Sequence, residues 1–183
     1  SPLTNVFWQS LNGQHRHFST GDERARRYSP GFSPIVGFPQ EDQPDFAALK
    51  TLFEIGEQFY CGGWTGPLPD DWTLHADATM YRMIWRGDAS SIDLEADATK
   101  HKQLYPELQL QPLQSQHAEQ AVALARLTNP GPFGLRTIEL GDYLGYFLDD
   151  RLVAMSGERM HAGIYHEVSG VCTHPDFQGK GLA

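Results

Sequence analysis

The spacing of apolar residues predicts two amphipathic helices. In residues 44–60 the apolar side chains recur three and four positions apart, after Pro44 and Asp45, which suit a first helical turn. This helix is expected to end at the glycines that follow Cys61, because glycine readily adopts the left-handed conformation that stops a helix. The second helix covers residues 117–129, with Ser115 as the expected N-cap and an apolar face formed by Ala118, Ala121, Val122 and Ala125. Asn129, Pro130 and Gly131 are expected to end it.

Alternation of apolar and polar positions predicts the strands. Residues 79–85 and 108–113 alternate and carry β-forming side chains. Two apolar runs joined by residues 149–151 (Asp-Asp-Arg) predict a hairpin, and residues 165–173 predict a further strand. Residues 87–102 are polar and acidic, and we interpret them as a loop or a boundary between two halves.

These elements predict an α/β (α+β) chain in two parts. Residues 1–105 form an N-terminal α/β half that contains turn formers, aromatic residues and no motif tied to chemistry. Residues 106–183 read as a strand, a helix, a linking segment and three consecutive strands, followed by a glycine loop. The first half is open to interpretation as a diverged copy of the second.

Composition narrows the classes of function. The 183-residue chain has 14 Lys and Arg against 23 Asp and Glu, a net charge of -9, which argues against nucleic acid as a partner. No apolar run is long enough for a membrane span, and the first residues lack a signal sequence, so a cytoplasmic protein without a membrane partner is expected. The two cysteines form no CxxC pair, and the histidines at 15, 17, 161 and 166 lack helical metal-ligand spacing, so we predict no metal.

The glycine loop at residues 178–183 (QGKGLA) follows the strand and turn GVCTHPDF. A Walker A loop is excluded, because His174 stands where it needs its first glycine and Gly181 where it needs Ser or Thr. A dinucleotide-binding fingerprint would need a third glycine at the position after Ala183, where the sequence stops. The loop does match the pattern Q/R-x-x-G-x-G/A, with Gln178 at its first position. An ordinary glycine turn is the alternative.

This loop, with the apolar-x-Thr-x-Pro lead before it, resembles the pyrophosphate-binding loop of the GNAT superfamily of N-acetyltransferases, which use acetyl-CoA. The resemblance covers about residues 108–183 and implies a mixed, mostly antiparallel sheet flanked by helices, truncated after the loop and therefore incomplete at its C-terminus. It also implies that the first half is a degenerate acetyltransferase-like copy. Backbone groups of the fourth strand would hold the pantetheine arm, and loop amides the pyrophosphate. The cofactor-binding residues so implied are Val171, Cys172, Thr173, Gln178, Gly179, Lys180, Gly181, Leu182 and Ala183.

The resemblance also implies where a general base would lie. Glu167 stands eleven residues before Gln178, the spacing of the strand glutamate in the histone-acetylating branch of that superfamily. Its alternative is a solvent-facing strand carboxylate. Glu158 is the second candidate base, with an ion pair to Arg159 or Arg136 as its alternative. No general acid is named, because the tyrosine commonly given that role lies beyond this sequence.

The function implied is acetyl transfer from acetyl-CoA to the amine of a small molecule or an amino-acid-like acceptor. A non-catalytic acyl-CoA-binding or assembly module is the alternative, and a homodimer is a possible assembly. Cys172 has no basic neighbour that would lower the pKa of its thiol, so we interpret it as a buried structural thiol, not a nucleophile.

Overall fold

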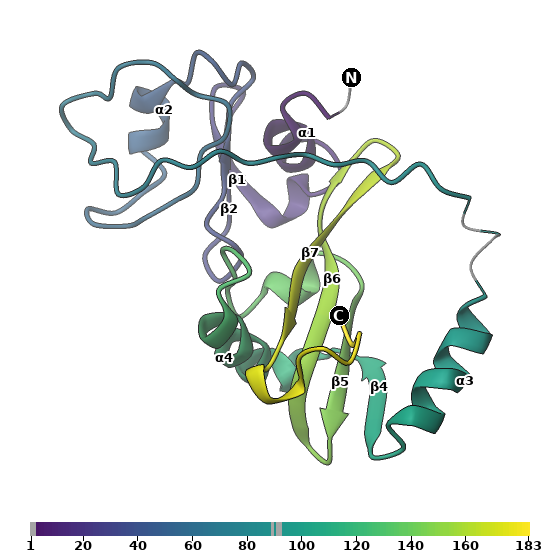
Figure 1. Ribbon diagram of the computed structural model, residues 1–183. Coiled ribbons are helices and arrows are strands. Elements are labelled where there is room, and N and C mark those ends of the chain that lie inside the picture. Colours follow the sequence, from purple (N-terminus) through teal and green to yellow (C-terminus); the bar gives the residue numbers. More distant parts are fainter. Residues whose placement is uncertain (1–2, 89, 91–92) are drawn as a thin grey trace.

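A four-stranded antiparallel sheet is the largest element of the computed structural model, which describes residues 3–88, 90 and 93–183 (Figure 1). Its strands follow one another in sequence order, β4-β5-β6-β7. Each neighbour pair is antiparallel, and the turn at Asp149 and Asp150 joins β5 to β6. The predicted strands of the second half and their hairpin are therefore confirmed. The bounds are Leu108–Pro112, Tyr143–Leu148, Arg151–Ala162 and Tyr165–Thr173 for β4 to β7 in turn.

Helix α4, Ala118–Thr128, packs against β6 and β7 (Figure 1). Its buried face holds Ala121, Leu124 and Ala125, which meet apolar side chains of the sheet in one core cluster. Asn129 adopts a left-handed φ of 52° and ends the helix as predicted. The predicted N-cap is wrong, because Ser115 starts a short 3-10 turn that precedes α4. Gln114 and His117 form the capping box of that turn. Among the described residues, no helix has both the length and the apolar character needed to cross a membrane.

Two bulges interrupt the pairing of β6 with β7. Cys172 pairs with Met155 and Ser169 with Gly157, so β7 holds one extra residue between these rungs. Gly170 lies there with a φ of 65°, which favours glycine. The second bulge lies on β6, where residues 158 and 161 pair with residues 168 and 166. Each bulge changes which side chains share a face of the hairpin, because an inserted residue shifts the alternation by one.

The N-terminal part packs against the four-stranded sheet through a shared hydrophobic core. It contains α1 (Val6–Asn12), α2 (Phe46–Lys50) and a small antiparallel sheet of three short strands. Phe7 and Leu11 of α1 pack in one buried cluster with Met160 of β6. The proposed boundary between residues 105 and 106 stays a prediction. The three strands are β1 (Ser19–Gly21), β2 (Arg26–Tyr28) and β3 (Val36–Gly37).

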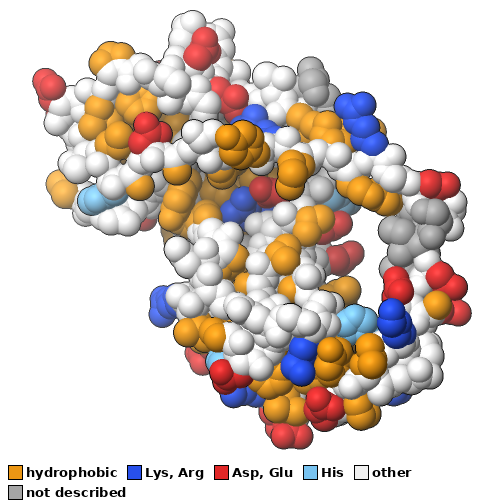
Figure 2. Space-filling view, viewed as in Figure 1, with side chains coloured by type: hydrophobic (Ala, Val, Ile, Leu, Met, Phe, Trp, Pro, Cys, Tyr) orange, Lys and Arg blue, Asp and Glu red, His pale blue; other side chains and the backbone are white. Residues whose placement is uncertain are grey.

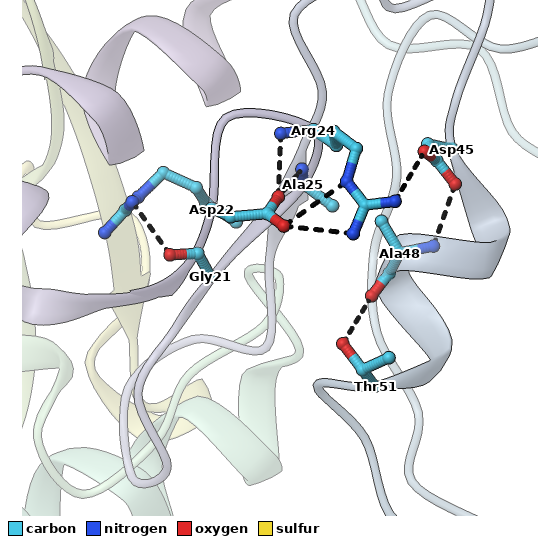
Figure 3. A network of polar contacts seen from close by, with 8 residues as sticks. Gly21, Asp22, Arg24, Ala25, Asp45, Ala48 and Thr51 are labelled. Atoms are coloured by element: carbon cyan, nitrogen blue, oxygen red, sulfur yellow. Dashed lines mark hydrogen bonds and ion pairs between the residues drawn. The ribbon is translucent and has the colours of Figure 1, made fainter.

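The side chains of the residues that flank α2 cap both ends of the helix (Figure 3). The Asp45 carboxylate accepts a hydrogen bond from the Ala48 N–H at 2.8 Å and lies 3.7 Å from the Arg24 guanidinium. The Thr51 hydroxyl donates to the Ala48 carbonyl at 2.8 Å where the helix ends. These caps satisfy backbone groups that a short helix would leave unpaired.

The helix predicted over residues 44–60 is therefore wrong beyond Lys50. Arg27 of β2 donates to the Leu52 carbonyl at 2.8 Å and forms a two-point ion pair with Glu57. These tertiary bonds hold the segment in a non-helical conformation. Intrinsic helix propensity is weak, so tertiary contacts of this kind override it. The apolar residues that suggested a helix instead pack in the cluster that includes Val36, Phe38, Ala48, Leu49, Phe53, Phe59 and Trp72.

Two further predictions between the halves are wrong. Residues 79–85 run extended but form no ladder with another described strand, and their side chains lie exposed on a segment that crosses the molecule (Figures 1 and 2). Residues 87–102, interpreted as a loop or a boundary between two halves, contain most of helix α3, Leu94–Leu104, so the loop is wrong and the boundary stays a prediction. Asp93 caps this helix by accepting from the Ala96 N–H at 2.9 Å. The N-cap and the good helix formers of this segment favour a helix, although the segment has few apolar residues.

Candidate active site

A pocket of about 330 Å³ lies where the end of β7, the glycine loop and the end of α4 converge. Its volume is in the range of small-molecule sites. Five of the residues predicted to bind a cofactor line it, together with Thr128 at the end of α4 and Pro130 just beyond it, which the sequence did not indicate. The seven lining residues are Thr128, Pro130, Val171, Cys172, Thr173, Gln178 and Ala183.

The loop presents backbone amides without side-chain obstruction. Gly179 and Gly181 have φ values of 77° and 66°, and a Cβ added at Gly179 would meet no atom within 4 Å. Within the described part of the chain, the N–H groups of residues 179–182 donate no hydrogen bond. They are therefore available to an anionic ligand.

Two loop side chains attach the loop to the body of the protein. Leu182 is 8% exposed and packs with Leu108, Val153 and Ala154. The Lys180 ammonium lies 4.7 Å from the centre of the Tyr105 ring, a cation-π contact. These contacts leave Leu182 and Lys180 with backbone groups for a ligand, which is the role that the resemblance implies for them.

Strand β7 offers an open edge beside the pocket. Among the described strands it pairs with β6 alone, and Val171 is 44% exposed on it. Cys172 is buried, as predicted, and burial raises the pKa of its thiol. A buried thiol with a raised pKa is a poor nucleophile, so Cys172 contributes packing and backbone groups.

The bulge at Gly170 was missed, although an isolated glycine within a strand pattern is a known signal of one. A Cβ at Gly170 would lie 3.1 Å from both the Phe133 and the Tyr143 rings, so these rings pack directly on the bulge. The buried Tyr143 hydroxyl has no hydrogen-bond partner among the described atoms, and burial raises the pKa of Tyr143. The bulge thus packs against the Phe133 and Tyr143 rings, which we call the aromatic wall.

The two candidate bases have different partners. Glu167 accepts two hydrogen bonds from Arg159, at 2.8 and 3.0 Å, and the Arg159 side chain is only 9% exposed. Glu158 lies instead against His161 and His166 of the same hairpin, at 3.3 and 3.0 Å. The predicted alternative, an ion pair of Glu158 with Arg159 or Arg136, is therefore wrong.

The histidines around Glu158 alter its acidity. Burial raises the pKa of Glu158, but the hydrogen bond from His166 and the charges of His166 and His161 outweigh burial and hold the pKa below its ordinary value. A carboxylate stabilised in its ionised form accepts a proton less readily. This environment suits Glu158 less well to general-base chemistry.

Comparison with known proteins identifies the fold. The sequence matches no protein-family model and no curated protein. A crystal structure from Novosphingobium aromaticivorans, of a protein assigned to the GNAT family of acetyltransferases, superposes on it with a TM-score of 0.65 at 26% identity. The match covers all of this chain and 75% of that chain. The chain thus has a GNAT-like mixed α+β fold with antiparallel sheets, a fold generally associated with acyl-CoA-dependent acetyl transfer.

Proposed function

We propose that this protein is an acetyl-CoA-dependent N-acetyltransferase that acts on the amine of a small molecule or an amino-acid-like acceptor. The observation that carries the proposal is the pocket in which the glycine loop, the open end of β7 and the end of α4 converge. The GNAT-like fold supports it, because the pocket involves the loop and strand on which the sequence resemblance rests.

The cofactor would lie along the loop and β7. The free N–H groups of residues 179–182 would bind the pyrophosphate, because backbone amides of a glycine-rich turn can stabilise anionic oxygens. The pantetheine arm would lie beside Val171, Cys172 and Thr173, where β7 has an unpaired edge that can accept an added strand-like chain. Gln178 and Ala183 line the pocket between these two parts.

The reaction requires the acceptor to be a neutral amine. Its nitrogen would attack the thioester carbonyl carbon, a C–N bond would form, and the C–S bond would break to release coenzyme A, whose sulfur takes up a proton. Glu167 is the first candidate for accepting the amine proton and Glu158 the second. A backbone N–H on the open edge of β7 would stabilise the oxyanion.

A second function is supported by one specific contact. Both oxygens of Glu167 accept hydrogen bonds from the buried Arg159 guanidinium, which occupies the atoms that a general base would use. In a non-catalytic acyl-CoA-binding or assembly module this ion pair would have a structural role alone. The pocket and loop are compatible with both functions.

Calorimetric titration of acetyl-CoA into the purified chain tests the cofactor assignment. We expect binding that Gly181→Asp abolishes, because its carboxylate would lie against the pyrophosphate. Gly56→Asp is the matched control, since Gly56 also has a positive φ, 89°, and has room for an added Cβ, but lies outside the glycine loop. Equal affinity in the wild type and the Gly181→Asp variant would contradict the assignment.

A further inference from the structure

Glu158, His161 and His166 bring three metal-ligating side chains together on the β6–β7 hairpin. One ligand atom from each lies within 4.8 Å of the others. Glu158 Oε1 is 3.0 Å from His166 Nδ1, and Glu158 Oε2 is 3.3 Å from His161 Nε2. The two imidazole rings stack with their centres 4.0 Å apart.

The bulge on β6 is what assembles this cluster. His161 and His166 are direct cross-strand partners, so their side chains share one face of the hairpin. Glu158 is three residues before His161, a spacing that places two side chains on opposite faces of a regular strand. The extra residue between the two rungs restores Glu158 to the face of the histidines. A regular strand of the same sequence would not form the cluster.

Two of the three donor separations are close to those of a tetrahedral metal site, and all three are within 4.8 Å. Zinc binds imidazole nitrogen and carboxylate oxygen at about 2.0–2.2 Å, which places tetrahedral ligands about 3.3 Å apart. The Oε1–Nδ1 distance to His166, 3.0 Å, and the Oε2–Nε2 distance to His161, 3.3 Å, are close to this value. Two histidines and one carboxylate form a donor set suited to zinc and to other first-row transition metals.

The surroundings of His161 support a ligand role independently. Its Nε2 is shielded from solvent and makes no hydrogen bond among the described residues, although it faces Glu158. The His161 backbone N–H donates to the Ser10 hydroxyl at 3.2 Å, and the His15 ring packs 4.7 Å from the His161 ring.

We propose that Glu158, His161 and His166 bind one Zn²⁺ ion, with the fourth position open to water or to a ligand donor. His161 is 17% exposed and Glu158 29%, whereas His166 is 47% exposed, so solvent reaches the cluster from the side of His166. The spacing of the histidines fits no helical motif, so the sequence alone predicts no metal. A strand bulge supplies the geometry that the spacing alone does not indicate. The site does not depend on the acetyl-CoA pocket and assigns Glu158 a ligand role.

Zinc titration of the chelator-treated full chain by isothermal calorimetry tests the proposal. We expect one Zn²⁺ per chain and at least about a tenfold loss of affinity in His166→Gln and in Glu158→Gln, since even outer-shell changes at metal sites cost about 10- to 100-fold. His75→Gln is the control, because His75 is exposed and lies outside the cluster. Co²⁺ loading gives a second readout, an intense visible absorption band typical of tetrahedral nitrogen and oxygen coordination.

Circular dichroism and thermal unfolding of the zinc-free variants show whether each is folded before its affinity is compared. His166 is half exposed, so its replacement is expected to leave the fold intact. Absence of stoichiometric Zn²⁺ binding by the wild type overturns the proposal. It is equally overturned if His166→Gln binds as tightly as the wild type, or if His75→Gln loses as much affinity as His166→Gln.

Discussion

Arg159 and Glu167 form a two-point ion pair across the β6–β7 hairpin, with Nη2–Oε1 and Nε–Oε2 distances of 2.8 and 3.0 Å. The arginine side chain is 9% exposed and the glutamate 30%. Fixed two-point geometry makes such a pair stronger than a single contact, and loss of either partner leaves a charge with little solvent. The residue proposed as general base is thus also part of the framework of the hairpin.

Glu167→Gln is expected to abolish most acetyl transfer while leaving acetyl-CoA affinity unchanged. The amide cannot accept the amine proton, a loss of about 10²- to 10⁴-fold in rate, whereas residue 167 is absent from the pocket lining. Steady-state kinetics and calorimetry on the same preparation separate the two effects. Because the change also leaves Arg159 without its partner, we expect the free energy of unfolding to fall by about 2 kcal/mol.

The double variant Arg159→Gln and Glu167→Gln is the control for that stability effect. It removes both charges, so its unfolding free energy should recover part of the loss measured for Glu167→Gln. If the rate stays low in the double variant although its stability recovers, the loss of rate is due to the missing base and not to instability. An unchanged turnover in Glu167→Gln would contradict the base assignment and favour the other candidate, Glu158.

Gly170→Ala is expected to destabilise the protein by about 1–3 kcal/mol and to weaken acetyl-CoA binding. The added Cβ would meet the Phe133 and Tyr143 rings at 3.1 Å, at a φ of 65° that disfavours alanine. Chemical denaturation and calorimetry measure the two effects. Gly56→Ala shares the positive φ but not the close contacts, so it is expected to cost less and to leave affinity unchanged. Equal behaviour of the two variants would show that the aromatic wall does not constrain the bulge.

Tyr143→Phe and Tyr28→Phe form a matched pair, because both hydroxyls are buried but only that of Tyr28 has hydrogen-bond partners among the described residues. Tyr28 bonds the Ser10 hydroxyl at 3.2 Å and His15 Nδ1 at 2.8 Å, so its replacement should cost about 1–2 kcal/mol. The Tyr143 hydroxyl has no partner among the described atoms, so removing it should be neutral or stabilising by up to about 1 kcal/mol. Denaturant titration measures both. A loss above about 1 kcal/mol in Tyr143→Phe would indicate a bound water or ligand at that hydroxyl.

The Arg27–Glu57 pair should make stability depend on pH. The hydrogen bonds from Arg27 and from the Glu54 N–H lower the pKa of Glu57, so its stabilisation is present above the ordinary glutamate pKa of 4.5. This stabilisation disappears as pH falls through the lowered value of the folded state. Glu57→Gln should therefore cost about 1 kcal/mol at pH 7, a modest value because the carboxylate is one-third exposed, and progressively less below about pH 4. A wild-type advantage that persists unchanged at pH 3 would contradict this linkage.

The second half of the chain was largely predictable because its local patterns agree with its tertiary environment. Strand β7 has the predicted bounds, and Asn129 ends α4 where a left-handed residue was expected. The first half was less predictable, because hydrogen bonds between residues far apart in sequence override its local pattern. The contacts of Arg27 with Leu52 and Glu57 end the helical path that the spacing of residues 44–60 favours.

The amino-acid sequence by itself determined the glycine loop and the order of the strands around it, since these depend on spacing within short segments. Only the tertiary structure decided the partners of the two glutamates. One inserted residue in β6 turns Glu158 toward two histidines, while Arg159 pairs with Glu167 across the hairpin. A one-residue shift reverses the face of every side chain after it, and residues 158–161 of β6 contain no glycine that would indicate where the pairing slips.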